Sequence, residues 1–118
     1  MTILVVALDK DVRDLIRNLL ERSDRDILIA ADEGEALDLA GSAEIDLLLT
    51  EVAPSLDGRS LAKRLRARVP GIRVLFVTGW FDHPDFGELQ EEALVKEPFS
   101  REQLTQAIDA VLRGHPKP

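Results

Sequence analysis

The chain has 118 residues, which is enough for one domain with a single hydrophobic core and too few for two. Hydrophobic residues make up 45% of the sequence and aromatic residues only 4%, so the core is expected to be aliphatic. Fifteen Lys and Arg side chains against twenty-two Asp and Glu give a net charge of −7, which argues against direct nucleic-acid binding through phosphate contacts. The absence of cysteine excludes a disulfide framework, a thiol nucleophile and a thiolate metal site.

The expected domain covers residues 1–114, and the tail at 115–118 is expected to be frayed. The chain begins with an apolar run that lacks a cationic leader and a small-residue cleavage site. No apolar run approaches the roughly 18 residues that are needed to cross a bilayer. We therefore expect a cytoplasmic protein with no membrane partner.

The first third of the chain alternates between strand and helix patterns. Residues 3–8 form a continuous, β-branched apolar run, which is typical of a strand buried on both faces of a parallel sheet. Asp9 or Asp11 then caps a helix, in which apolar side chains recur at i, i+3, i+4, i+7 and i+8 as far as about Glu21. A short apolar run over 27–31 indicates the second strand.

The middle of the chain continues this alternation. A modest helix is expected over 34–44, where small and aliphatic side chains share one narrow face. The third strand is expected over 45–50, and turn-forming residues follow it. Apolar side chains at a spacing of four then predict a helix over 61–69, which the Pro-Gly pair at 70–71 ends before the fourth strand at 72–78.

The last third contains both the weakest helical pattern and one of the clearest. A feeble helical pattern surrounds Phe86 and Leu89, and a short strand is expected over 93–96. A clean i, i+3, i+4 stripe predicts the final helix over 104–112. Five strands that alternate with five helices predict a single α/β domain, in which right-handed crossovers build a doubly wound parallel sheet covered on both faces.

Functional groups in such a sheet are expected at the carboxyl ends of the strands. No strand is followed by a Gly-rich phosphate-binding loop. No Ser-His-Asp arrangement is evident either, because His83 lies in a Pro-containing loop and His115 lies in the tail. The side chains that remain at the strand ends are Asp9, Glu51, Thr78, Lys96 and Glu97.

The motifs around these residues resemble the receiver domains of bacterial two-component signalling. Four motifs occur in the family's order and cover nearly the whole chain: ILVVALDKDVRDLIRNLL, DLLLTEVAPSLDG, VLFVTGW and LVKEPF. The resemblance implies a flavodoxin-like (βα)5 fold with the strand order 2-1-3-4-5. In that family an acidic pair holds Mg²⁺, an aspartate after the third strand accepts a phosphoryl group from a partner histidine, and a lysine neutralises the resulting charge. A Ser or Thr hydroxyl of the fourth strand bonds the phosphoryl oxygen.

The position of the family's acidic pair is occupied by Ala7 and Leu8, whose apolar side chains cannot ligate Mg²⁺. Asp9 follows one position late, and we favour it as the cap of the first helix. No resident cofactor is therefore expected. Asp9 and Glu51 are the candidates for a weakly held metal ion.

The position of the phosphoacceptor contains no aspartate. Counting forward from Asp46 selects Glu51, whereas counting backward from Asp57 and Gly58 selects Thr50, because the loop is one residue short. Glu51 carries one methylene more than aspartate, so its carboxylate could imitate a phosphorylated acceptor without being a competent one. Alternatively, Glu51 is an ordinary solvated charge at the mouth of a loop.

The position of the lysine also differs from the family pattern. The residue directly before Pro98 is Glu97, and Lys96 lies one step earlier, where a strand turns its side chain to the opposite face. Thr78 alone fits the family pattern, as the switch hydroxyl. Trp80 either begins the loop that moves on activation in the family or packs over the end of the fourth strand.

We hypothesise that Glu51 and Glu97 converge in one cleft. Two adjacent carboxylates raise the pKa of one of them or attract a cation, unless Arg59 or Lys96 folds in to pair with them. The alternative is that both are solvated charges whose pKa values are unshifted.

Three functions follow from these observations. The favoured one is a degenerate receiver, or pseudo-receiver: a non-enzymatic module that contacts a histidine kinase or phosphotransfer domain, with a homodimer also open, and that does not use aspartate phosphorylation. The second is a working phosphoacceptor that uses Glu51 and a weakly held metal ion. The third is a sensor of a nucleotide second messenger, which would bind phosphates through arginines. The basic run available to such a sensor comprises Lys63, Arg64, Arg66, Arg68 and Arg73.

Overall fold

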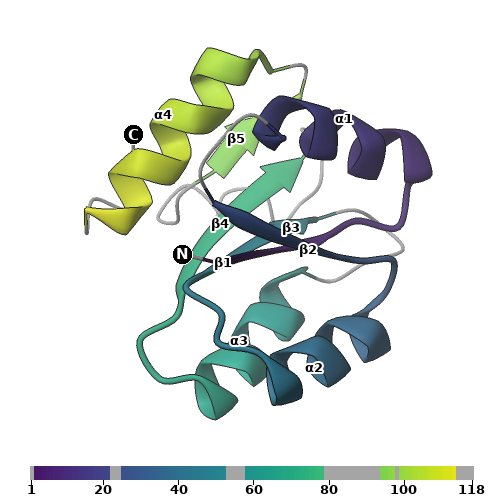
Figure 1. Cartoon of the computed structure of the whole chain (residues 1–118), viewed down its shortest axis with the longest axis vertical. Coiled ribbons are helices and arrows are strands. Elements are labelled where there is room, and N and C mark those ends of the chain that lie inside the picture. Colours follow the sequence, from purple (N-terminus) through teal and green to yellow (C-terminus); the bar gives the residue numbers. More distant parts are fainter. Residues whose placement is uncertain (1, 22–24, 53–57, 79–93, 98, 114–118) are drawn as a thin grey trace.

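The computed structural model describes residues 2–21, 25–52, 58–78, 94–97 and 99–113 (Figure 1). Within them, five parallel strands form one sheet: β1 (Thr2–Val6), β2 (Asp26–Ala30), β3 (Leu47–Glu51), β4 (Arg73–Thr78) and β5 (Leu94–Lys96). The helices in these ranges are α1 (Lys10–Leu20), α2 (Glu33–Ser42), α3 (Gly58–Arg68) and α4 (Arg101–Leu112). The strand order β2-β1-β3-β4-β5 confirms the predicted doubly wound α/β fold.

Helices cover both faces of the sheet, with α1 and α4 on one side and α2 and α3 on the other (Figure 1). Successive residues of a strand point to opposite faces. In β1, Ile3 and Val5 therefore pack in the core beneath α1 and α4, whereas Leu4 and Val6 pack beneath α2 and α3. Because both faces of β1, β3 and β4 are buried, each of these strands reads as a nearly continuous apolar run.

Several sequence predictions lie outside the described residues. They are the helical pattern around Phe86 and Leu89, the placement of Trp80 and the frayed tail at 115–118. In the ranges that the structure does describe, no helix is both long enough and apolar enough to cross a membrane.

Aspartate side chains begin the first two helices. Asp9 caps α1, because its Oδ1 accepts a hydrogen bond of 2.8 Å from the N–H of Asp11, and this confirms the predicted cap. Asp32 caps α2 in the same manner, with the N–H of Glu35 as the donor at 2.8 Å. The cap of α1 ends the loop that leads from β1, so it fixes the backbone next to the candidate site.

A capping box begins α4. The N–H of Gln103 donates to Oγ of Ser100 at 3.1 Å, and the N–H of Ser100 donates to Oε1 of Gln103 at 2.8 Å.

Ser100→Ala is expected to lower the free energy of unfolding by about 1 kcal/mol in urea denaturation. Ser42→Ala is the control, because the Ser42 hydroxyl bonds only carbonyls of its own helix, at 3.4 and 3.5 Å. Equal losses in the two variants would contradict a stabilising role for the box.

Candidate functional site

Glu51 ends β3 and is 8% exposed. The strand lies between β1 and β4, next to the point where the strand order reverses, which is where doubly wound sheets bind their ligands. The N–H of Leu8 donates to Oε1 of Glu51 at 3.2 Å, so the carboxylate faces the end of β1. A Cβ at Gly58 would lie 2.6 Å from the carbonyl oxygen of Glu51. Only glycine therefore allows α3 to begin this close to the end of β3.

Ala7 and Leu8 follow β1 and bring apolar side chains to the site. Ala7 is fully buried, and Leu8 packs against the core beneath α2 and α3. Arg13, from α1, donates from one guanidinium nitrogen to the carbonyl oxygens of both residues, each at 2.9 Å. These two charge-assisted bonds hold the backbone that presents the Leu8 N–H to Glu51. No signal in the sequence identified Arg13, because its partners are main-chain atoms.

The two buried threonines of the site direct their hydroxyl groups to backbone carbonyls. Thr78 ends β4, is 1% exposed and donates to the carbonyl oxygen of Val52 at 2.9 Å. Thr50 donates to the carbonyl oxygen of Glu51 at 3.2 Å. Of the two residues that sequence counting offered as the acceptor position, Glu51 is therefore the one whose side chain contacts the end of β1.

Lys96 ends β5, and Glu97 follows it directly. Glu97 is half-buried, and its N–H donates to the carbonyl oxygen of Thr78 at 2.9 Å. Lys96 is exposed and lines a hollow beside α4, together with Gln103 and Gln106. That a shift of one residue changes the face stays a prediction. The charge of Glu97 acts on Glu51 by raising its pKa, whereas the resemblance implies a lysine in this turn.

Three carboxylates from three strand ends influence one another, and we call Asp9, Glu51 and Glu97 the strand-end cluster. Burial raises the pKa of Glu51, and the negative charges of Glu97 and Asp9 raise it further, while the N–H groups of Leu8 and Asp9 oppose the shift. Burial also raises the pKa of Glu97, and the charge of Asp9 adds to this effect. These shifts support the hypothesis that Glu51 and Glu97 converge.

Among the described residues, no group of three or more acidic or histidine side chains is arranged to hold a metal ion. Arg59, one of the two cations considered as a partner, is half-buried in the first turn of α3. In the basic run of α3, Arg64 forms an ion pair with Glu33 of α2, and Lys63 is exposed.

The fold and its strand order define a flavodoxin-like α/β domain. The chain matches the family model of the response regulator receiver domain over residues 3–109 and belongs to that family. Receiver domains are modules of two-component signalling that interact with histidine kinases or phosphotransfer proteins, and they are generally not enzymes. The resemblance predicted from the four motifs is therefore confirmed.

Relatives of known sequence or structure agree with this assignment. The chain is 33% identical over 115 residues to the alkaline phosphatase synthesis transcriptional regulatory protein PhoP of Bacillus subtilis, covering 94% of this chain and 48% of that protein. It is 25% identical to the response regulator receiver protein CpdR of Brucella abortus, covering 93% and 95% of the two chains. The receiver domain of the hybrid histidine kinase CckA is 28% identical, with a TM-score of 0.77 over 95% of this chain and 99% of that one. The chain thus spans about half the length of PhoP.

Proposed function

We propose that this receiver domain is degenerate: it signals by contact with a protein partner and does not use aspartate phosphorylation. The observation that carries the proposal is the strand-end cluster, in which Glu51, the residue that forward counting selects as the acceptor position, has its pKa raised by burial and by the negative charge of Glu97. A phosphoryl group is dianionic near neutral pH, and its transfer needs positive charge nearby. Adding it beside two carboxylates would be opposed by charge repulsion.

The end of β1 supports the same conclusion. Mg²⁺ in proteins is held by carboxylate and other oxygen ligands. Ala7 and Leu8 supply no side-chain oxygen, and their carbonyl oxygens accept hydrogen bonds from Arg13. The guanidinium therefore takes up one lone pair of each of these carbonyl oxygens and places a positive charge beside them. Asp9 contributes its Oδ1 to the helix cap.

Without phosphoryl transfer, the signal passes through contact with a protein partner. Receiver domains interact with histidine kinases and phosphotransfer proteins, and a partner of this class fits the present chain. The buried carboxylate of Glu51, held by the Leu8 N–H, places a fixed negative charge where a phosphorylated receiver carries one. We infer that this charge holds the domain in one conformation for its partner.

Acetyl phosphate tests the proposal directly. The parent, incubated with acetyl phosphate and Mg²⁺, is expected to keep its unmodified mass in intact-protein mass spectrometry. Beryllofluoride with Mg²⁺ is expected to leave the amide resonances of residues 47–52 unchanged in NMR spectra. A phosphoryl adduct on Glu51 would instead establish an unconventional but working phosphoacceptor and overturn the proposal. A receiver domain with the full set of acidic and lysine residues serves as the positive control for both reagents.

A further inference from the structure

The outer edge of β2 is a pairing surface that the monomer leaves open. In the described part of the chain, β2 is an edge strand that pairs with β1 alone, in one continuous register from Thr2 opposite Asp26 to Val6 opposite Ala30. Edge strands are commonly protected by lysine, proline or a bulge. The sequence of β2, DILIA, has no lysine and no proline, and its register has no bulge.

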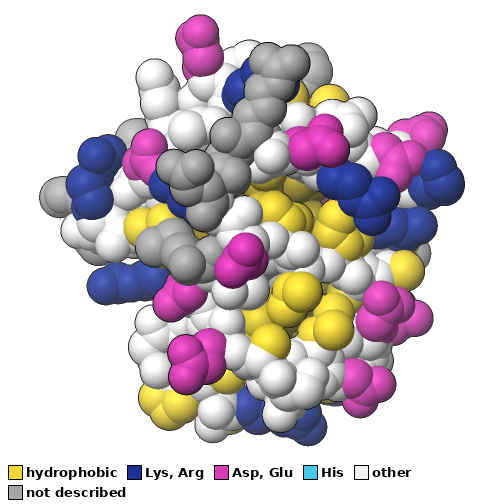
Figure 2. Space-filling model, viewed as in Figure 1, with side chains coloured by type: hydrophobic (Ala, Val, Ile, Leu, Met, Phe, Trp, Pro, Cys, Tyr) yellow, Lys and Arg dark blue, Asp and Glu magenta, His cyan; other side chains and the backbone are white. Residues whose placement is uncertain are grey.

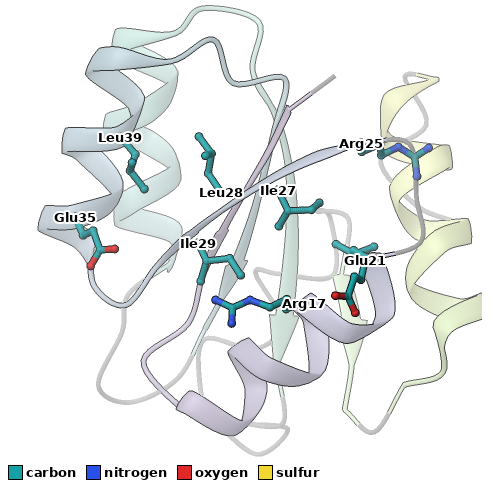
Figure 3. A pocket seen from close by; sticks show the side chains of 9 residues that line it. Arg17, Glu21, Arg25, Ile27, Leu28, Ile29, Glu35 and Leu39 are labelled. Carbon is teal, nitrogen blue, oxygen red and sulfur yellow. The ribbon is translucent and has the colours of Figure 1, made fainter.

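Apolar side chains flank this edge on both sides. Ile27, Leu28 and Ile29 are half-buried and line a groove of about 500 Å³ between α1 and α2. Figure 3 shows Ile27 and Ile29 on the side of α1, and Leu28 on the side of α2 with Leu39. Figure 2 shows hydrophobic side chains gathered on this face, with Lys and Arg and with Asp and Glu around them. Apolar patches with a polar rim mark interaction surfaces.

Charged side chains of both signs lie at the rim of the groove. Arg17 lies in the last turn of α1 and Glu21, its C-cap, lies one turn further along; both are exposed. In Figure 3 Arg17 lies beneath Ile29, whereas Glu21 lies toward Arg25 at the start of β2. Arg17 and Glu21 therefore lie toward different ends of β2, and Arg25 and Glu35 add a positive and a negative charge to the rim.

We propose that two copies of the chain pair through β2 in antiparallel orientation, about a two-fold axis at Leu28. The axis sets Ile27 of each copy opposite Ile29 of the other, so these apolar side chains cover one another. The same axis brings Arg17 of each copy to Glu21 of the second copy, so the interface contains two identical ion pairs. The two sheets then form one continuous sheet, and the strand-end cluster takes no part in the contact.

Charge reversal tests the pairing in solution. Sedimentation velocity over a concentration series is expected to show a monomer–dimer equilibrium for the parent. Arg17→Glu and Glu21→Arg are each expected to weaken dimerisation about tenfold, equivalent to about 1.4 kcal/mol. The double variant with both substitutions restores opposite charges and is expected to restore the dimer. Lys63→Glu, an exposed reversal on α3, is the control and is expected to have no effect.

An introduced cysteine tests the geometry itself, because the chain has none of its own. Opposed Cα atoms in an antiparallel pair lie about 4.5 to 5.5 Å apart, which is within the range that a disulfide spans. Leu28→Cys is therefore expected to form a disulfide-linked dimer on mild oxidation, whereas Lys63→Cys is not. A parent that is monomeric at every concentration would overturn the proposal, because β2 would then not pair with a second copy. A dimer that is insensitive to both reversals, with no crosslink for Leu28→Cys, would overturn it too.

Discussion

A variant that combines Ala7→Asp, Leu8→Asp, Glu51→Asp and Glu97→Lys is expected to bind Mg²⁺ and to take a phosphoryl group from acetyl phosphate, and the parent is expected to do neither. Two carboxylates after β1 supply oxygen ligands for the metal ion. The aspartate at the end of β3 supplies the acceptor, and the lysine supplies the positive charge that phosphoryl transfer requires. The change from no phosphorylation to stoichiometric phosphorylation is measured by intact-protein mass spectrometry.

The scaffold for these four groups is already in place. Val6 lies opposite Thr50 in the sheet, so the residues that follow β1 adjoin the end of β3. The N–H of Glu97 bonds the carbonyl oxygen of Thr78, which fixes the residue after β5 beside the end of β4. The side chains differ from what the family uses, and the loop after β3 is one residue short. Mg²⁺ at about a hundredfold excess over its dissociation constant is expected to stabilise the four-residue variant by about 2.7 kcal/mol and the parent not at all.

Partial variants separate the contributions. Glu51→Asp alone is expected to remain unphosphorylated, because it adds neither a metal ligand after β1 nor a cation. The variant that lacks only Glu51→Asp is expected to gain Mg²⁺-dependent stability without phosphorylation. Buried aspartates are costly, so circular dichroism first checks that each variant folds. A folded four-residue variant that binds no Mg²⁺ would show that the shape of the loop after β3, and not the side chains, disables the site.

The fold could be predicted from the sequence because its signals are local. The run at residues 3–8 is apolar at every position because β1 is buried on both faces, and Asp9 occupies a cap position that its neighbours define. The strand pattern also predicts that Lys96 and Glu97 face opposite ways, since side chains alternate along a strand. These inferences need only neighbouring residues.

Other parts of the site depend on contacts between segments that are distant in the sequence. The choice between Thr50 and Glu51 required the register of β1 against β3, which places the Leu8 N–H at the carboxylate. The role of Arg13 rests on two main-chain carbonyls. Every residue has a carbonyl, so no residue type in the sequence marks these two as its partners. Gly58 looked like an ordinary turn residue, but its missing side chain allows α3 to approach β3.

Because of the strand-end cluster, the free energy of unfolding of the parent is expected to decrease as the pH rises above about 4.5. The pKa values of Glu51 and Glu97 are raised above their ordinary value of 4.5, chiefly by burial. Between the unfolded and folded pKa values, the folded state binds more protons than the unfolded state, so stability decreases with pH. The contribution is fully present below pH 4.5 and is lost once the pH exceeds the folded pKa values.

Glu51→Gln isolates this contribution. The amide keeps the size of the side chain and an oxygen that accepts from the Leu8 N–H, but it never ionises. Urea denaturation is therefore expected to show Glu51→Gln as more stable than the parent at pH 7 and equal to it below pH 4.5. Asp14→Asn, on the exposed surface of α1, provides a control of opposite sign, because a hydrogen bond from Lys10 lowers the pKa of Asp14. A difference between Glu51→Gln and the parent that is the same at every pH would mean that Glu51 is as solvated in the folded chain as in the unfolded one.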